Sequence, residues 1–180
     1  AGSFFNTTFQ TINTGPQWQV TANDTLSLTY QYVNTTFSQG GGFASGFETN
    51  GGLVGWTRVF SPNLKASASL GATRFASGEI KHLENADVTW SYKETGIHAQ
   101  YSRSVSPSFF IGGVPLLSNM LLASISHKVT QQVTFSLFGN YAKSESVPSG
   151  IILYSSYSYG PRLDYNLTKY ITTSLAYSHY

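Results

Sequence analysis

Bulky apolar residues occupy every second position through long stretches of this chain, and the pattern is clearest near residue 160. One phase of the alternation there consists of Tyr157, Tyr159, Pro161, Leu163, Tyr165 and Leu167. The other phase is small or polar, and the alternation resumes at residues 171–177 after a polar break. Because side chains along a β-strand alternate between two faces, these residues predict two strands joined as a hairpin.

Four more hairpins of the same kind are predicted upstream. Their strands are expected at residues 15–22 and 25–32, 52–60 and 64–75, 87–93 and 97–105, and 121–129 and 133–141. Short turns, such as the one at Ser61-Pro62-Asn63, join the two strands of each hairpin. Longer and more varied connections join successive hairpins, at residues 38–46, 76–85, 106–119 and 143–150. The sequence therefore predicts a single all-β domain over residues 1–180, with about ten strands in antiparallel, up-and-down order.

The two faces of the predicted strands indicate what surrounds them. Leu121, Ala123 and Ile125 form an apolar face, whereas Ser124 and Ser126 lie on a small polar one. A soluble barrel or sandwich would turn its apolar face inward and carry many charges outside. Charged residues are only 10% of this chain, against roughly 25% in a typical soluble domain, and aromatic residues are 15%. This composition favours a transmembrane β-barrel, with its apolar face toward lipid and its polar face lining the lumen.

The ends of the predicted strands fit a bacterial outer membrane. Short turns at one end and long connections at the other match the periplasmic and extracellular ends of such barrels, with both termini expected on the periplasmic side. No run approaches the ~20 apolar residues of a membrane helix. The first residues do not look like an export leader, so we expect a signal peptide to have been removed already. Aromatic residues suited to the headgroup level are Trp18, Trp90, Tyr92, Tyr141 and Tyr165.

Composition also narrows the partners and the chemistry. The net charge of +2 is scattered, so no nucleic-acid surface is expected; outer-membrane lipid and lipopolysaccharide are the expected surroundings. The chain has no cysteine, which excludes disulfides and thiolate metal sites. The four histidines lack metal-ligand spacing, and the adjacent residues of Ser126-His127 and Ser178-His179 face opposite ways on a strand. We expect no cofactor, no metal site and no enzyme activity.

A few ionisable residues fall on the predicted lumen face. Asp87, Arg162 and Asp164 project from strands there, and His98 and Gln100 share that phase. Arg162 lies two residues from Asp164 and is placed to pair with it or with a cross-strand neighbour. An ion-pair network that plugs or tunes a lumen is a commoner role for such groups than catalysis.

Three lysines lie near the short turns in the polar phase: Lys65, Lys93 and Lys128. Two interpretations are open for them. If they converge, they form a cationic ring in the lumen that favours anions. Otherwise they only keep the periplasmic rim soluble.

The connection at residues 106–119 is long and apolar. Exposed apolar loops usually mark contacts or fold inward. The sequence leaves three roles open for it: lying across the barrel mouth, inserting among outer-leaflet lipids, or binding a partner. Its candidate contact residues are Phe109, Phe110, Ile111, Leu116 and Leu117.

Three stretches carry a family resemblance: residues 101–108 (YSRSVSPS), 124–130 (SISHKVT) and 159–168 (YGPRLDYNLT). They resemble segments of the outer-membrane β-barrel proteins of bacterial exopolysaccharide systems, a group associated with exosortase loci. The likeness is best over residues 87–180 and weak before residue 64, and it consists of strand and turn patterns. It implies an outer-membrane location and a part in moving or anchoring polysaccharide, in a family whose members often have more strands. It supplies no catalytic residue.

The predicted function is that of a non-enzymatic barrel, a narrow pore or a scaffold, with exopolysaccharide export as the process that the resemblance implies. A barrel of ~8–10 strands has an interior largely filled by side chains, which argues against a wide general porin. The alternative is a surface interaction or adhesion barrel, or the barrel subunit of a larger envelope complex. An enzyme at the rim is the least favoured interpretation, because no catalytic constellation is present.

Overall fold

The computed structural model describes residues 5–39, 43–107, 114–147, 153–168 and 170–180. No helix in this part of the chain is long and apolar enough to cross a membrane. The strands are β1 (Phe5–Thr14), β2 (Gln17–Gln19), β3 (Asp24–Gln39), β4 (Phe43–Ser61), β5 (Leu64–Phe75), β6 (Ile80–Tyr92), β7 (Thr95–Pro107), β8 (Pro115–Lys128), β9 (Val133–Ser146), β10 (Leu153–Asn166) and β11 (Thr172–Ala176).

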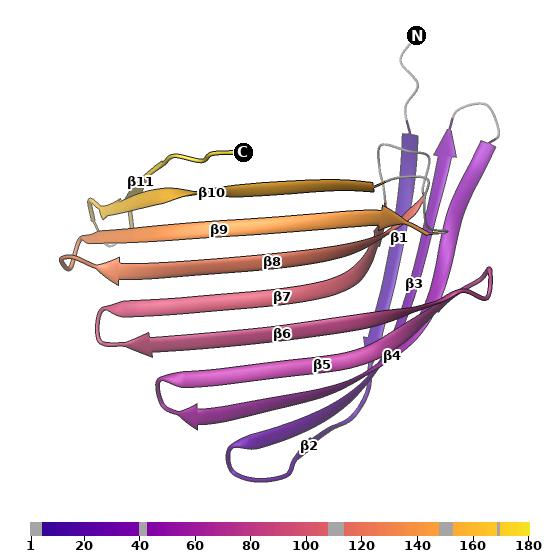
Figure 1. The fold of residues 1–180 in the computed structure, drawn as a ribbon, viewed down its shortest axis with the longest axis horizontal. Coiled ribbons are helices and arrows are strands. Elements are labelled where there is room, and N and C mark those ends of the chain that lie inside the picture. The colour runs from indigo at the N-terminus through magenta and orange to yellow at the C-terminus, as the bar shows by residue number, and fades with distance from the viewer. Residues whose placement is uncertain (1–4, 40–42, 108–113, 148–152, 169) are drawn as a thin grey trace.

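All the strands belong to one antiparallel sheet (Figure 1). Its order is β1-β3-β4-β5-β6-β7-β8-β9-β10-β11, with the short β2 paired to β3. The register of β1 against β3 continues without a shift into β2. These two are parts of one strand, interrupted at Gly15-Pro16 because proline has no N–H to donate. The all-β, antiparallel up-and-down architecture of about ten strands predicted from the sequence is confirmed.

Most strands extend further than the sequence predicts. β8 begins at Pro115 instead of residue 121, β6 at Ile80 instead of 87, and β4 at Phe43 instead of 52. β1 was not predicted, because its Thr- and Asn-rich sequence alternates too weakly. The predicted connection at 106–119 is therefore wrong in extent and shrinks to the residues between Pro107 and Pro115. Beyond the apolar stretch the strands continue, because their backbone N–H and C=O groups still need partners.

The sheet has two unlike ends. At one end, which we call the turn end, short turns join β2 to β3, β4 to β5, β6 to β7, β8 to β9 and β10 to β11. We call the opposite end the loop end. In Figure 1 the turn ends of β5 to β10 lie at the left. At the loop end the first half of β4, together with β3 and β1, rises steeply across the direction of β5 to β10 (Figure 1).

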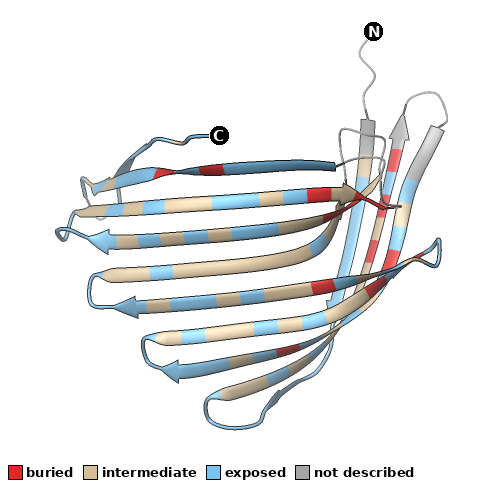
Figure 2. Ribbon diagram, in the orientation of Figure 1, coloured by how far each residue is buried: buried red, intermediate tan, exposed pale blue. Residues whose placement is uncertain are grey.

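Exposed and less exposed residues alternate along the strands (Figure 2). The more exposed residues belong to the apolar phase and the less exposed ones to the polar phase. Leu70 of β5 is 66% exposed and Leu121 of β8 is 50% exposed. Their polar neighbours Ser69 and Ser124 are only partly exposed. The alternation is clearest in β3 and β8, where the assignment of residues to two faces agrees with the sequence prediction.

Burial is concentrated at the loop end. Phe75 of β5, Leu117 of β8 and Val147 form one apolar cluster, against which Phe47 of β4 and Val105 of β7 pack. β6 and β7 separate β5 from β8 in the sheet. The sheet therefore rolls over at its loop end until the ends of β4 and β5 meet those of β7 to β9. The buried apolar residues are Val33, Phe37, Phe75, Leu83, Leu116, Leu117 and Val147.

β1 and β11 are the two ends of the strand order. In the described residues no strand pair joins them to each other. With ten strands on this antiparallel path, β1 and β11 run in opposite directions, as the closing strands of an even-numbered antiparallel barrel do.

Candidate functional site: the polar face and its boundaries

The polar face carries a shallow hollow of about 320 Å³ across β3 to β7. Its floor is made of small residues that face one another in register, Ser27 with Gly55 and Gly55 with Ser69. A Cβ atom added at Gly55 would lie 2.5 Å from the hydroxyl oxygen of Ser27. The hollow therefore exists because the strands carry glycine and serine here. Its polar lining residues are Ser27, Thr57, Ser67, Ser69, Asn85, Asp87 and Gln100.

Three of the candidate lumen residues lie together beside this hollow. His98 of β7 pairs with Asp87 of β6, with 2.7 Å between Nε2 and Oδ2. Gln100 lies directly opposite Asp87 in the register of β6 and β7. Each side chain of the pair is a little over one-third exposed. The sequence predicted a shared face for these three residues, and the register of β6 and β7 brings them together on it.

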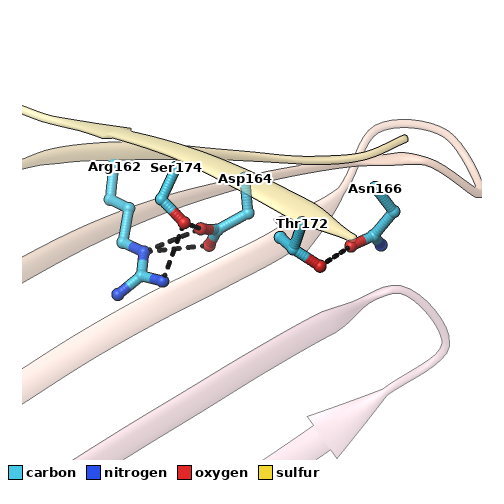
Figure 3. Close-up of polar contacts among 5 residues, drawn as sticks. All are labelled: Arg162, Asp164, Asn166, Thr172 and Ser174. Atoms are coloured by element: carbon cyan, nitrogen blue, oxygen red, sulfur yellow. Dashed lines mark hydrogen bonds and ion pairs between the residues drawn. The ribbon is translucent and has the colours of Figure 1, made fainter. Parts of the chain in front are cut away.

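A second polar network ties β11 to β10 (Figure 3). The Nε of Arg162 donates to both carboxylate oxygens of Asp164, at 2.9 and 3.0 Å. Ser174 donates to Asp164 and accepts from the Nη2 of Arg162. One step closer to the turn, Thr172 donates to Asn166 at 2.7 Å. Arg162 and Asp164 thus pair as their spacing indicates, and the network fastens the short edge strand.

The three lysines near the turns are all exposed and lie on different turns or strand ends. Lys93 occupies the β6–β7 turn with a φ of 50°. Its Nζ lies 5.3 Å from the centre of the Tyr92 ring, which belongs to the apolar face. No described contact joins Lys93 to Lys65 or Lys128, so the cationic ring stays a prediction.

The candidate contact loop divides into two parts. Phe109, Phe110 and Ile111 lie outside the described residues. Leu116 and Leu117 belong to β8 and are 5% and 0% exposed. Consecutive strand residues point to opposite faces, so the start of β8 is covered on both sides. The placement of these two leucines in an exposed loop is therefore wrong, because the rolled sheet encloses them.

Aromatic residues with bonded polar tips mark both ends of the apolar face. At the loop end the hydroxyls of Tyr30 and Tyr101 donate to Asn50 and Asn119, respectively. At the turn end the indole N–H of Trp56 donates to Asp24 at 3.1 Å. Tyr30, Trp56 and Tyr101 are not among the headgroup-level aromatic residues that the sequence predicts, although each carries the same combination of an apolar ring and a polar tip.

Three further aromatic residues mark the turn end. Trp90 stacks on Tyr92, with 6.2 Å between ring centres, and the Tyr165 hydroxyl donates to Gln132 at 3.4 Å. Side chains with an apolar body and a polar tip are typical of the two interfaces of a membrane.

The described residues offer little for catalysis or metal binding. They contain no group of three His, Asp or Glu side chains that could hold a metal ion. His127 contacts the hydroxyl of Thr95 at 2.9 Å, and His179 packs against the rings of Tyr157 and Tyr159. Asp87 and His98 form an acid–base pair, which the described hydrogen bonds do not extend to a serine hydroxyl.

Comparison with known proteins adds one structural similarity. No model of a protein family matches the chain, and no curated protein matches it. Among solved structures, it is similar to the NanC porin with a TM-score of 0.45 and 8% sequence identity, over 93% of this chain and 86% of that one. We draw no conclusion about this chain from a similarity at that level.

Proposed function

We propose that this chain forms the wall of a β-barrel in a bacterial outer membrane and acts there as a non-enzymatic scaffold or narrow pore. The observation that supports this proposal is that the apolar face of the sheet is the exposed one, which is the reverse of the arrangement in a soluble protein. Residues on it such as Leu28, Val54, Leu70, Leu121 and Leu137 are 47%, 60%, 66%, 50% and 48% exposed. Soluble monomers rarely expose an apolar surface of this extent.

Energetics support a lipid environment for this face. Removing a large apolar side chain from water stabilises it by about 1.5–3 kcal/mol, and every strand from β3 to β10 contributes such side chains. The aromatic residues at both ends of the face fit headgroup depth. In hydrocarbon, β1 and β11 would also need partners for their outer backbone groups, and their opposite directions suit mutual pairing.

The loop end favours a scaffold or a gated channel over a wide open pore. Both faces of β8 are covered at its start, and Phe75, Leu117 and Val147 exclude water from this end. On the polar phase, hydroxyls form a chain from Ser106 through Ser118 to Ser144. A barrel of about ten strands is expected to have a largely filled interior, and the packing of Phe47 against Phe75 at the loop end supports that expectation.

Membrane fractionation tests the location. The protein, expressed in a Gram-negative host behind an export signal, is expected in the outer membrane after a urea wash. Unheated samples should migrate differently from boiled ones in SDS gels, because a folded barrel resists the detergent. Recovery of folded, monodisperse protein from the soluble periplasm without detergent would overturn the proposal.

Conductance separates the scaffold from the open pore. In planar bilayers the purified protein is expected to give current steps far smaller than those of a general porin. Large, constant steps would exclude the plugged scaffold. A surface interaction barrel, the alternative, would show equally little conductance but would retain a partner through its loops.

Exopolysaccharide export is the process that we propose for the barrel on the strength of the family resemblance. The hollow on the polar face favours it, because hydroxyls and amides around a single Asp87–His98 pair suit an uncharged polyhydroxylated chain. Disruption of the gene is expected to reduce polymer at the cell surface, and a version with Gly55→Trp, which fills the hollow, should fail to restore it. Full restoration of surface polymer by the Gly55→Trp version would show that the hollow takes no part in export.

A further inference from the structure

A row of polar donors lies immediately beyond the apolar face at the loop end. Tyr101 of β7, Leu121 of β8 and Tyr141 of β9 are opposite one another in the register and form the last row of the exposed apolar face there. The next row toward the loop end, on the same face, consists of Arg103, Asn119 and Lys143. The row beyond it contains Val105 and Leu117, which belong to the enclosed cluster or pack against it, with Glu145. This donor row therefore lies between the exposed apolar face and that cluster.

The two cations of the row have no counter-ion in the described residues. The ion pairs found there are formed by Arg58, Lys81, His98 and Arg162. Glu84 lies opposite Arg103 on β6 and Glu145 follows Lys143 on β9, yet neither acid pairs with them. The Nε of Arg103 is buried and has no hydrogen-bond partner in this part of the chain. Such an unpaired, partly buried guanidinium is costly unless an anion meets it.

Asn119 completes the donor set. Its Oδ1 accepts the Tyr101 hydroxyl at 3.2 Å, which leaves the amide nitrogen to donate. Neighbouring strands are about 4.8 Å apart, so Arg103 and Lys143, two strands apart, are separated by about 10 Å at the backbone. Arginine and lysine side chains are long enough to span that gap and reach one tetrahedral anion, and a guanidinium is well matched to a phosphate.

We propose that Arg103, Asn119 and Lys143 bind the phosphate of an anionic lipid headgroup in the leaflet at the loop end. This inference rests on the proposed membrane location and adds a specific lipid site to it. The tyrosines of the row below sit at headgroup depth, and Leu121 and Ile125 continue the apolar track for an acyl chain. The turn end offers a contrast, because Arg58 there is already paired with Asp24.

Lipid binding in detergent tests the site without requiring insertion into a membrane. The full chain would be titrated with dioleoyl phosphatidylglycerol and, separately, with dioleoyl phosphatidylcholine, and bound lipid counted by native mass spectrometry. Arg103→Gln/Lys143→Gln is expected to weaken phosphatidylglycerol binding about tenfold or more, since each charge-assisted contact contributes substantially. Phosphatidylcholine binding should not change.

Two control variants keep the outcome interpretable. Arg58→Gln removes one cation from the turn end of the same face and is expected to leave phosphatidylglycerol binding unchanged. Arg103→Lys/Lys143→Arg keeps both charges and should retain most of the affinity, which shows that loss in the first variant is not misfolding. Unchanged phosphatidylglycerol affinity in Arg103→Gln/Lys143→Gln would overturn the proposal.

A free anion is the competing occupant. Inorganic phosphate at millimolar concentration is expected to bind far more weakly than the lipid, because it lacks the apolar track. If inorganic phosphate binds the unaltered protein as tightly as phosphatidylglycerol does, the lipid assignment is wrong. Failure of the membrane proposal would appear instead in fractionation, so the two failures are distinguishable.

Discussion

The two ends of this sheet are built from the same alternating strands but reach opposite states of burial. At the loop end, both faces of β8 are covered and Leu117 is 0% exposed. At the turn end, the same strand and its neighbours alternate between an exposed and a partly exposed face. The difference lies in the rolling of the sheet, because in the described residues the ends of β4 and β5 pack against those of β7 to β9 at the loop end. Local pattern therefore assigns a face to each side chain, and long-range packing decides what covers that face.

The strongest test of this comparison is the removal of packing at each end of one strand. Leu117→Ala is expected to lower the free energy of unfolding by about 2–5 kcal/mol, because it leaves a cavity in an enclosed cluster. The matched variant Leu121→Ala, on the same strand and in the same phase, should cost clearly less, because its side chain is half exposed. Urea unfolding in detergent micelles measures both, and equal losses would contradict the comparison.

Opening the loop end should change transport as well as stability. Phe47→Ala/Phe75→Ala removes two rings that lie 6.5 Å apart in and beside the apolar cluster. We expect a severalfold rise in conductance in planar bilayers, because water and ions enter a constriction once its apolar lining is thinned. Leu70→Ala on the apolar face of β5 is the control and should conduct as the unaltered protein does. Conductance that stays unchanged in the double variant would show that the cluster does not close the lumen.

The polar network at the turn end is expected to contribute far less than the cluster. The Arg162 and Asp164 side chains are 51% and 21% exposed, and exposed ion pairs contribute about 0.2–1 kcal/mol. A double-mutant cycle with Arg162→Met and Asp164→Asn measures the coupling through urea unfolding. Hydrogen exchange of β11 amides should rise in either variant. A coupling free energy as large as the loss of unfolding free energy in Leu117→Ala would contradict the proposed difference between the two ends.

The smallest effect is expected from pH at the turn end. Asp24 lies outside the apolar belt, and its pKa is lowered first by the hydrogen bond from the Thr21 hydroxyl, then by Trp56 and Arg58. A lowered pKa stabilises the fold above the unfolded value of 3.8, and this contribution is lost as pH falls through the folded pKa. Unfolding midpoints of the protein and of Asp24→Asn should differ slightly at pH 7 and converge as the pH falls below 3.8 through the folded pKa. Midpoints that diverge on acidification would contradict a lowered pKa of Asp24 in the folded protein.

Sequence periodicity is enough to predict which candidate residues share a face. Asp87, His98 and Gln100 lie on one face of adjacent strands, and their contact follows from a hairpin register. Lys93 could not be placed in the same way. It follows the last residue of β6 and takes a positive φ, so the strand phase no longer fixes its direction.

The run of antiparallel hairpins, with one apolar and one small polar face, follows from the amino-acid sequence alone. That information is local, since a period of two and short turn signals act within a few residues. The enclosure of both Leu116 and Leu117, and the common row of Arg103, Asn119 and Lys143, follow instead from the folded sheet. Those outcomes depend on strand extension beyond the apolar belt and on contacts between strands that are not neighbours. Such long-range geometry leaves no periodic signal in the residues that it brings together.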